Sequence, residues 1–236
     1  MASWMIHLRV AQGIYKQLGL KHMNAFILGN IAPDSGIPKE DGSGYLPDAG
    51  VSHFRVVDQN GIKEVHEERF IERFFTDELR ESYDEETYAF YFGYLTHLLT
   101  DKLWAEEIGY GAKDKFAELF DRDRTAFWSQ IKRDWYDMDF MYLRKNPDFE
   151  AFRRYESMEE LLNRYVDFFA PDAFEKRRQF ITTFYRDGAA NVKVRETYLS
   201  MEELDRFVIS AVEEILRQCS DYVEELARDE ICAVQA

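Results

Sequence analysis

The stretch Tyr91-Phe-Gly-Tyr-Leu-Thr-His97-Leu-Leu-Thr-Asp101 decides the fold that we expect for this chain. Most of its side chains are apolar or aromatic, which is typical of a helix buried inside a protein. His97 and Asp101 stand four residues apart, so a helix places them on one face, about one turn apart. A carboxylate in such surroundings needs a partner, because its desolvation is costly. The stretch therefore predicts a buried helix from about residue 84 to 107 that can present an imidazole and a carboxylate to one metal ion.

The rest of the chain is expected to be helical, with the irregular parts concentrated in its first half. Residues 33–50 hold three of the five prolines and four glycines, which favours a long loop. Alternating apolar patterns are sparse, and only 51–58 and 192–198 suggest short extended pieces. The further helices that the periodicity predicts cover 4–20 with a stop at Gly19, 22–31, 66–79, 112–145, 157–169, 172–186 and 200 to about 229.

Two segments carry a recognisable helix start. Ser157-Met-Glu-Glu and Ser200-Met-Glu-Glu each have the pattern of a capping box at a helix N-terminus. They share this cap and no longer repeat. We expect one all-α, multi-helix domain over residues 1–236, with long loops in its N-terminal half.

The composition bounds the class of protein. A chain of 236 residues suits one large domain, and its 46% hydrophobic and 16% aromatic content argues against disorder. The formal net charge of −15 argues against nucleic acid or an anionic membrane as a partner, because phosphate backbones select basic surfaces. An anionic substrate stays compatible with it, since a bound divalent metal can be the largest local charge in a site.

Cysteine usage and hydropathy indicate where the protein works. The two cysteines, Cys219 and Cys232, match no Cys-based zinc motif and are too few for a disulfide framework. No segment approaches the roughly 20 apolar residues that span a bilayer, and the first residues lack the regions of a signal peptide. We therefore expect a cytoplasmic protein without a transmembrane segment.

Five residues in the first half of the chain have the chemistry of metal ligands. His7 lies in the first predicted helix, Asp34 lies where a helix gives way to the long loop, and His53 lies in an apolar stretch after that loop. With His97 and Asp101 they offer the imidazole nitrogens and carboxylate oxygens that hard and borderline divalent ions bind. Each taken alone has a simpler explanation, such as a core or surface histidine, a turn aspartate or an acid paired with Arg or Lys.

The remaining candidates are interpreted differently. His22 and His66 stand beside charged neighbours and are expected at the surface. Asp134, Asp137 and Asp139 are expected on a solvated face with an interleaved aromatic core stripe, and a late metal-binding carboxylate is the alternative. The aromatic side chains after residue 110 are expected in the core rather than in a substrate pocket.

Several of these segments, taken together, resemble a known family. They follow one another as residues 3–7 (Ser-Trp-Met-Ile-His), 28–35 (Leu-Gly-Asn-Ile-Ala-Pro-Asp-Ser), 52–54 (Ser-His-Phe) and 91–101. This combination resembles the zinc-dependent phospholipase C family, whose fold is also used by S1/P1-type nucleases. The resemblance covers roughly residues 1–104, and it implies an all-α, phospholipase C/P1 nuclease-like fold.

The resemblance implies a zinc centre built from the five candidates. His97, His53 and Asp34 would hold one ion. Asp101 would hold the same ion or bridge to a second one, which His7 would serve. Zinc is the expected metal, as one ion or two, and nickel, manganese or iron would accept the same donors.

The sequence departs from the family at two places. The family's secreted enzymes use the amine and carbonyl of an N-terminal Trp as ligands, whereas Met-Ala-Ser precedes Trp4 here. Those enzymes also carry a further His and a late His-x-x-x-Glu for another zinc, and this chain has no histidine after His97. The resemblance thus implies a reduced centre in a cytoplasmic branch of the family.

Metal-dependent hydrolysis of a phosphate ester is the first functional hypothesis. A bound ion would activate a water and neutralise charge on the phosphoryl oxygens, and Asp34 is the first choice for taking the water's proton. Asn30 and Ser52 are candidates for orienting the ligands, with Tyr45 and Tyr94 as walls of the pocket. The substrate would be a small phosphorylated compound or a lipid head group.

Two alternatives to this hypothesis stay open. A closed four-ligand site would make the protein a non-catalytic metal-binding or structural domain, in which the ion pins the long loop to the central helix. Without any metal, the acidic helical protein would act by binding another protein. The sequence does not decide the oligomeric state.

Overall fold

The computed structural model describes residues 1–59, 63–188 and 196–224, and in these ranges the protein is helical with two short hairpins. This confirms the expected all-α class. The helices are α1 (Trp4–Leu18), α2 (Met23–Ile31), α3 (Ala49–Ser52), α4 (Glu67–Phe74), α5 (Asp77–Ser82), α6 (Glu85–Trp104), α7 (Gly111–Lys115), α8 (Ala117–Arg122), α9 (Arg124–Lys145), α10 (Glu150–Ser157), α11 (Ala173–Gly188) and α12 (Met201–Gln218), with a 3-10 turn at Ala32–Asp34 and a π-helix at Ala105–Tyr110.

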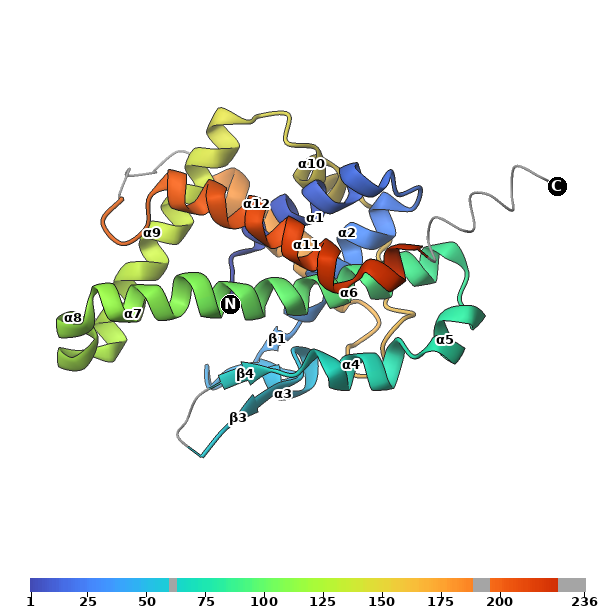
Figure 1. The fold of residues 1–236 in the computed structure, drawn as a ribbon, viewed down its shortest axis with the longest axis horizontal. Helices are drawn as coiled ribbons and strands as arrows, with labels where there is room; N and C mark the ends of the chain where they lie inside the picture. The colour runs from blue at the N-terminus through green and yellow to red at the C-terminus, as the bar shows by residue number, and fades with distance from the viewer. Residues whose placement is uncertain (60–62, 189–195, 225–236) are drawn as a thin grey trace.

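The helix predicted from the central stretch is α6. The side chain of Asp84 caps it by accepting the N–H of Thr87 at 2.7 Å, and nearly every residue from Tyr88 to Trp104 is buried. Figure 1 shows α6 running across the molecule, with α1, α2, α10, α11 and α12 on one side and the hairpins with α4 on the other. Its position between these two layers buries its whole circumference, which explains why its sequence shows no polar face.

Two glycines allow α2 to cross α6 at close range. A Cβ on Gly29 would lie 1.9 Å from the carbonyl oxygen of Phe90, and a Cβ on Gly93 would lie 2.1 Å from that of Phe26. Only glycine lets the two backbones approach so closely. The crossing places Asn30, near the end of α2, beside His97 of α6.

Helix α1 agrees closely with its prediction. Ser3 caps its start by accepting the N–H of Ile6, and Gly19 ends it in the left-handed conformation with φ of 65°. Its buried face packs against α2, α10 and α12. The helix therefore carries His7 into the interior with a fixed orientation.

The expected long loop at 33–50 contains more structure than its composition suggested. It holds the 3-10 turn and an antiparallel hairpin of β1 (Ile37–Pro38) with β2 (Tyr45–Leu46). The side chain of Asp48 then caps α3. The extended piece expected at 51–58 is confirmed as β3 (Arg55–Val57), which pairs with β4 (Lys63–Val65) in a second hairpin.

Tertiary packing overrides the helix predicted at 157–169. Ser157 ends α10, and the segment that follows is irregular. The ring of Tyr165 stacks on Phe90 at 3.8 Å, while the Asn163 amide donates to the carbonyls of Val166 and Phe169. A regular helix cannot make these contacts, so the predicted cap at Ser157 is wrong. The cap at Ser200 is confirmed, with both hydrogen bonds of a capping box.

Other predicted boundaries shift. The helix expected at 66–79 is divided by Thr76, whose side chain caps α5. The amphipathic stretch 112–145 forms α7, α8 and α9. Helix α12 ends at Gln218, short of 229, and the predictions for 192–195 and for residues beyond 224 lie outside the described residues.

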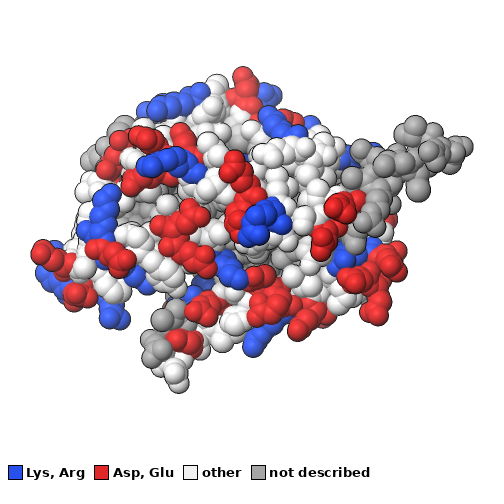
Figure 2. All heavy atoms as spheres, in the orientation of Figure 1, with Lys and Arg blue, Asp and Glu red and all other residues white. Residues whose placement is uncertain are grey.

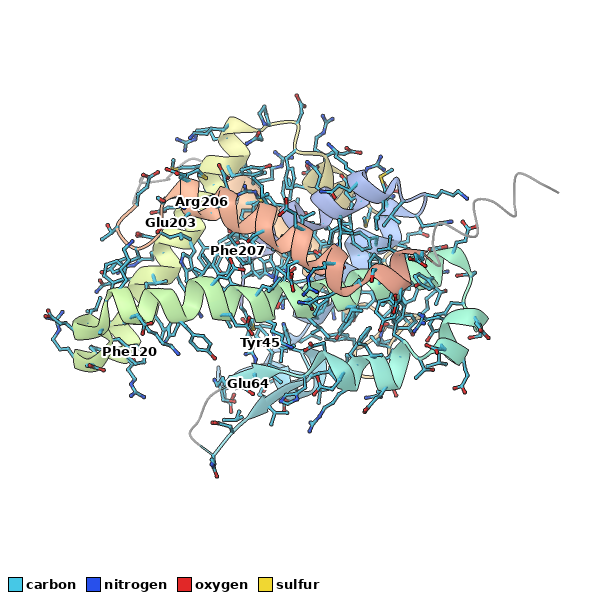
Figure 3. The ribbon with its side chains drawn as sticks, in the orientation of Figure 1. Tyr45, Glu64, Phe120, Glu203, Arg206 and Phe207 are labelled. Atoms are coloured by element: carbon cyan, nitrogen blue, oxygen red, sulfur yellow. The ribbon has the colours of Figure 1, made fainter. Side chains whose placement is uncertain are left out.

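The core is rich in aromatic rings, as the composition predicted. In Figure 3, Phe207 projects from α12 toward α6, where its ring meets that of Trp104 at 5.0 Å. Trp135 of α9 contacts Trp104 at the same distance, so the rings after residue 110 complete the core. On the face seen in Figure 2, acidic side chains form several small groups with basic side chains between them.

Candidate metal centre

The structure brings all five candidate ligands to one place inside the protein. His7, His97 and Asp101 form one group, and Asp34, His53 and His97 form another; within each group the potential ligand atoms lie within 4.8 Å of one another. His97 belongs to both groups. Three separate regions of the chain therefore meet around one histidine of α6.

The five side chains reach the centre from four places in the chain. His7 projects from α1 and stacks its ring on that of His97, with centroids 3.7 Å apart and planes 6° apart. Asp34 lies at the end of the 3-10 turn after α2, and His53 follows α3. Asp101 lies one turn along α6 from His97, as the four-residue spacing predicted.

The distances describe a compact cluster. His53 Nε2 lies 3.2 Å from Asp34 Oδ1, and His7 Nε2 lies 3.4 Å from Asp101 Oδ1. Asp101 Oδ2 is 3.9 Å from His97 Nε2 and 4.0 Å from His53 Nε2. Asp101 thus stands between the two groups, with one oxygen toward each.

Contacts behind the cluster orient two imidazoles. His97 Nδ1 lies 2.7 Å from the carbonyl oxygen of Asn30; because a carbonyl only accepts, Nδ1 carries the proton and Nε2 keeps its lone pair for the centre. Ser52 Oγ lies 2.9 Å from His53 Nδ1, and Tyr94 OH donates to the Ser52 carbonyl. Ser52 contacts His53 through its side chain, whereas Asn30 contacts His97 through its backbone carbonyl, and the Asn30 amide makes no hydrogen bond with the described residues.

The backbone at the start of the chain also contributes. Ala2 N–H donates to Asp101 Oδ1 at 2.8 Å, and Ser3 Oγ, the cap of α1, donates to Asp139 Oδ1 at 2.8 Å. Tyr185 OH donates to the other oxygen of Asp139 at 2.8 Å. Asp139 of α9 thus anchors the N-terminal end of the helix that carries His7.

The polar atoms that face the centre fit a metal ion. His7 Nε2, His53 Nε2, His97 Nε2 and Asp101 Oδ2 are buried and make no hydrogen bond with any of the described residues. Burying such atoms without partners is costly. Three imidazole nitrogens and two carboxylates form a donor set that zinc accepts, so a zinc ion would satisfy the atoms that the protein leaves unpartnered.

The protonation states suit metal binding. Burial and the neighbouring His7 lower the pKa of His97 to about 3, so its imidazole is neutral. Burial would raise the pKa of Asp101, but the Met1 α-amino group and the two histidines of its group outweigh burial and hold that pKa well below its usual range. The pKa of Asp34 is lowered in the same way, because contacts with His53, His97 and His7 outweigh burial. A neutral imidazole and ionised carboxylates are the forms that bind metal.

Several predictions around the centre are corrected. Tyr94 is fully buried and stacks on Phe70 at 4.8 Å, so it supports the centre and does not line an open mouth. Tyr45 is 52% exposed on β2, and its role as a wall of the pocket stays a prediction. Asp134 and Asp139 are buried rather than solvated, because Asp134 accepts the N–H groups of Thr197 and Tyr198 and Asp139 anchors α1.

The other histidines and Trp4 lie away from the cluster. His22 pairs with Glu85 at 3.2 Å and is partly exposed, while His66 pairs with Glu68. The Trp4 ring packs among aromatic side chains of α9 and α11. Sequence reasoning missed Arg55, whose Nη2 lies 3.8 Å from Asp101 Oδ2; its position two residues after His53 was the available signal.

The cluster of three histidines and two aspartates inside an all-α fold is a candidate metal centre. Residues 6–104 match the family model described as zinc dependent phospholipase C. This segment, which contains all five candidate ligands, is similar to that family. The family is zinc-dependent, and its description supports a metal-dependent role in hydrolysing phospholipid.

The other comparisons gave no match. Neither the curated proteins nor the solved structures contain one that matches the chain. Within the described residues, every helix is too short or too polar to cross a membrane.

Proposed function

We propose that the protein hydrolyses the phosphate ester of a phospholipid, with His7, Asp34, His53, His97 and Asp101 as ligands of the metal centre. The observation that carries the proposal is that four buried donor atoms without hydrogen-bond partners among the described residues lie in two adjoining ligand groups that share His97. When bound, the metal supplies a lowered pKa for the attacking water and neutralises charge on the phosphoryl oxygens. The family match over residues 6–104 supports the phospholipid as substrate class.

The orientation of His97 limits how the ligands are shared. Its Nδ1 donates to Asn30, so a single nitrogen, Nε2, is left to bind an ion. His97 can therefore complete the group of Asp34 and His53 or the group of His7 and Asp101, but not both. Asp101, with an oxygen toward each group, is the bridging residue if two ions bind.

Asp34 is the ligand best placed to act on the reacting water. Its side chain is 11% exposed, whereas those of the other four ligands are at most 5% exposed. Its lowered pKa keeps the carboxylate ionised at neutral pH. An ionised oxygen at the open side of the centre can accept a hydrogen bond from the water and aim it at phosphorus.

The test is hydrolysis by metal-replete protein of a panel of phospholipids, phosphomonoesters and phosphodiesters. We expect release of the phosphorylated head group from phospholipid, and loss of this activity in Asp34→Asn at a zinc concentration at which elemental analysis shows the variant to be loaded. Metal-replete protein that hydrolyses none of the panel would contradict the proposal.

Burial of the ligands favours one alternative, a structural metal site. If four protein ligands close the coordination sphere, the ion only joins α1, α6 and the loop after α2. Cobalt-substituted protein distinguishes the two, because an open position gives an absorption spectrum that changes when inorganic phosphate is added. The cytoplasmic location and the single-domain organisation stay predictions.

A further inference from the structure

We propose that Arg55 binds the anionic phosphoryl oxygens of the substrate beside the metal centre. The inference rests on the proposed function and assigns a binding role to a residue outside the ligand set. Its guanidinium Nη2 lies 3.8 Å from Asp101 Oδ2. The same oxygen faces His97 and His53, so the guanidinium stands at the edge of the metal cluster.

The backbone holds Arg55 in this position. Phe54, between His53 and Arg55, has φ of 51°, a left-handed conformation that costs a non-glycine residue free energy. The Phe54 ring is locked among other aromatic rings, with Phe70 at 5.6 Å, and its carbonyl accepts the N–H of His66. The turn therefore keeps Arg55 at the start of β3 directly after a ligand.

Pairing with β4 restricts Arg55 further, because it lies opposite Val65 in the second hairpin. Figure 3 labels Tyr45 and Glu64 on the two hairpins, on the side of α6 from which this segment approaches. The Arg55 side chain is 17% exposed. It is thus held against the centre and still reaches solvent, as a residue that meets a substrate must.

The contact with Asp101 leaves the guanidinium donors available. The 3.8 Å between Arg55 Nη2 and Asp101 Oδ2 is too long for a hydrogen bond. The other carboxylate oxygen, Asp101 Oδ1, accepts the Ala2 N–H. In the described part of the chain, this is the only ion pair that a Lys or Arg makes with Asp34 or Asp101. A guanidinium presents its donors in a planar fork that matches two phosphoryl oxygens.

The charge balance favours an anion at this position. The carboxylates of Asp34 and Asp101 balance one divalent ion, so Arg55 leaves the centre with a net positive charge. The whole chain carries a formal net charge of −15, which repels a phosphate ester at long range. A local cation next to the reacting group offsets this repulsion where the ester binds.

The experiment measures ligand binding as well as activity. Zinc-loaded wild type, Arg55→Gln, Arg55→Lys and Lys63→Gln are titrated calorimetrically with inorganic phosphate. They are also titrated with a short-chain phosphatidylcholine analogue in which a methylene replaces the glycerol oxygen on phosphorus. Lys63→Gln is the matched control, because it removes an exposed positive charge from the same hairpin. Zinc affinity is measured in each variant by competition with a chelator.

We expect Arg55→Gln to weaken binding of both ligands by about 10- to 100-fold, because it removes charge-assisted hydrogen bonds to the phosphoryl group. Arg55→Lys recovers part of this loss, and Lys63→Gln binds as wild type does. Zinc affinity stays unchanged or rises, since a nearby positive charge is removed. If Arg55→Gln weakens binding of inorganic phosphate but not of the lipid analogue, Arg55 contacts free phosphate rather than a lipid head group.

Two results would overturn the inference. One is a wild-type protein that binds zinc but no phosphate. The other is an Arg55→Gln variant whose zinc affinity falls while its phosphate affinity stays the same, because Arg55 would then only position Asp101. Failure of the proposed function looks different: phosphate binding depends on Arg55, yet no ester is hydrolysed.

Discussion

At the scale of single residues, His97 is the position on which the centre depends. It belongs to both ligand groups, its Nδ1 is held by the Asn30 carbonyl, and its ring stacks on His7. No other side chain in the described residues combines these three contacts. Replacing it removes a donor from both groups and an orienting partner from His7.

His97→Ala should lose zinc. We expect its zinc affinity to fall by more than the roughly 10–100-fold that loss of an outer-shell partner costs, as measured by chelator competition and elemental analysis. The apo protein should also lose about 1–3 kcal/mol of unfolding free energy, because the Asn30 carbonyl is left buried without a donor. His22→Ala, which removes a partly exposed histidine paired with Glu85, is the control and should keep its zinc.

Asp139 should make stability depend on pH. Burial raises its pKa from 3.8 to about 7, against the lowering effect of its hydrogen bonds with Ser3 and Tyr185. Between these values the unfolded chain releases a proton that the folded protein retains. Wild-type stability therefore falls as pH rises through this window, by up to about 1.4 kcal/mol per pH unit from this group.

Asp139→Asn removes this titration. The unfolding free energy of the variant minus that of wild type should increase by about 2–3 kcal/mol from pH 5 to pH 8. Urea unfolding at both pH values measures the difference. A difference between variant and wild type that is the same at both pH values would show that Asp139 is already ionised at pH 5.

At the scale of elements, the crossing of α2 and α6 decides whether the ligands meet. Helix α2 leads into the turn that carries Asp34, and α6 carries His97 and Asp101. The two helices touch through Gly29 and Gly93, where backbone lies against backbone. The spacing between these ligands is therefore set by two residues that have no side chain.

Gly93→Ala should separate the two helices. Its new methyl group would lie 2.1 Å from the Phe26 carbonyl, so α2 must shift, at a cost of about 1–3 kcal/mol or more. We expect lower unfolding free energy in urea and weaker zinc binding. Gly111→Ala, where nothing lies within 4 Å of the new methyl, is the matched control and should be neutral or slightly stabilising. Equal zinc affinity in Gly93→Ala and wild type would contradict the proposed coupling.

At the scale of the whole molecule, the metal centre joins parts of the chain that are far apart in sequence. It lies where α1, the turn after α2, the residue after α3, and α6 meet, so an ion bound there would cross-link both layers seen in Figure 1. A ligand that binds the folded state alone stabilises it in proportion to the logarithm of its concentration. Zinc should therefore stabilise the entire fold.

Removal of zinc should lower the melting temperature. At a free zinc concentration 100 times the dissociation constant, binding contributes about 2.7 kcal/mol, which corresponds to roughly 5–10 °C for a chain of this size. Differential scanning calorimetry before and after chelation, with zinc added back, measures the shift. In His97→Ala the melting temperature should not respond to zinc; an identical response in that variant would place the binding elsewhere.

Much of this architecture can be predicted from local sequence. The apolar run of α6, the stop at Gly19 and the capping box at Ser200 each act within one or two turns, so residues 4–20, 84–107 and the start of α12 were predicted with small errors. The prediction failed at 157–169, because there Tyr165 and its neighbours pack against residues more than 70 positions away. Periodicity cannot detect such contacts.

The amino-acid order alone determined the helical class, the spacing of His97 and Asp101 on one helix, and the chemistry of the five candidate ligands, because these follow from periodicity and side-chain type. Only the tertiary structure decided that His7, Asp34 and His53 reach that helix, that Arg55 stands beside Asp101 and that Asp139 is buried. Those placements depend on the glycine crossing of α2 with α6 and on the turn at Phe54. Contacts between distant segments arise from packing of the whole chain, which no local pattern encodes.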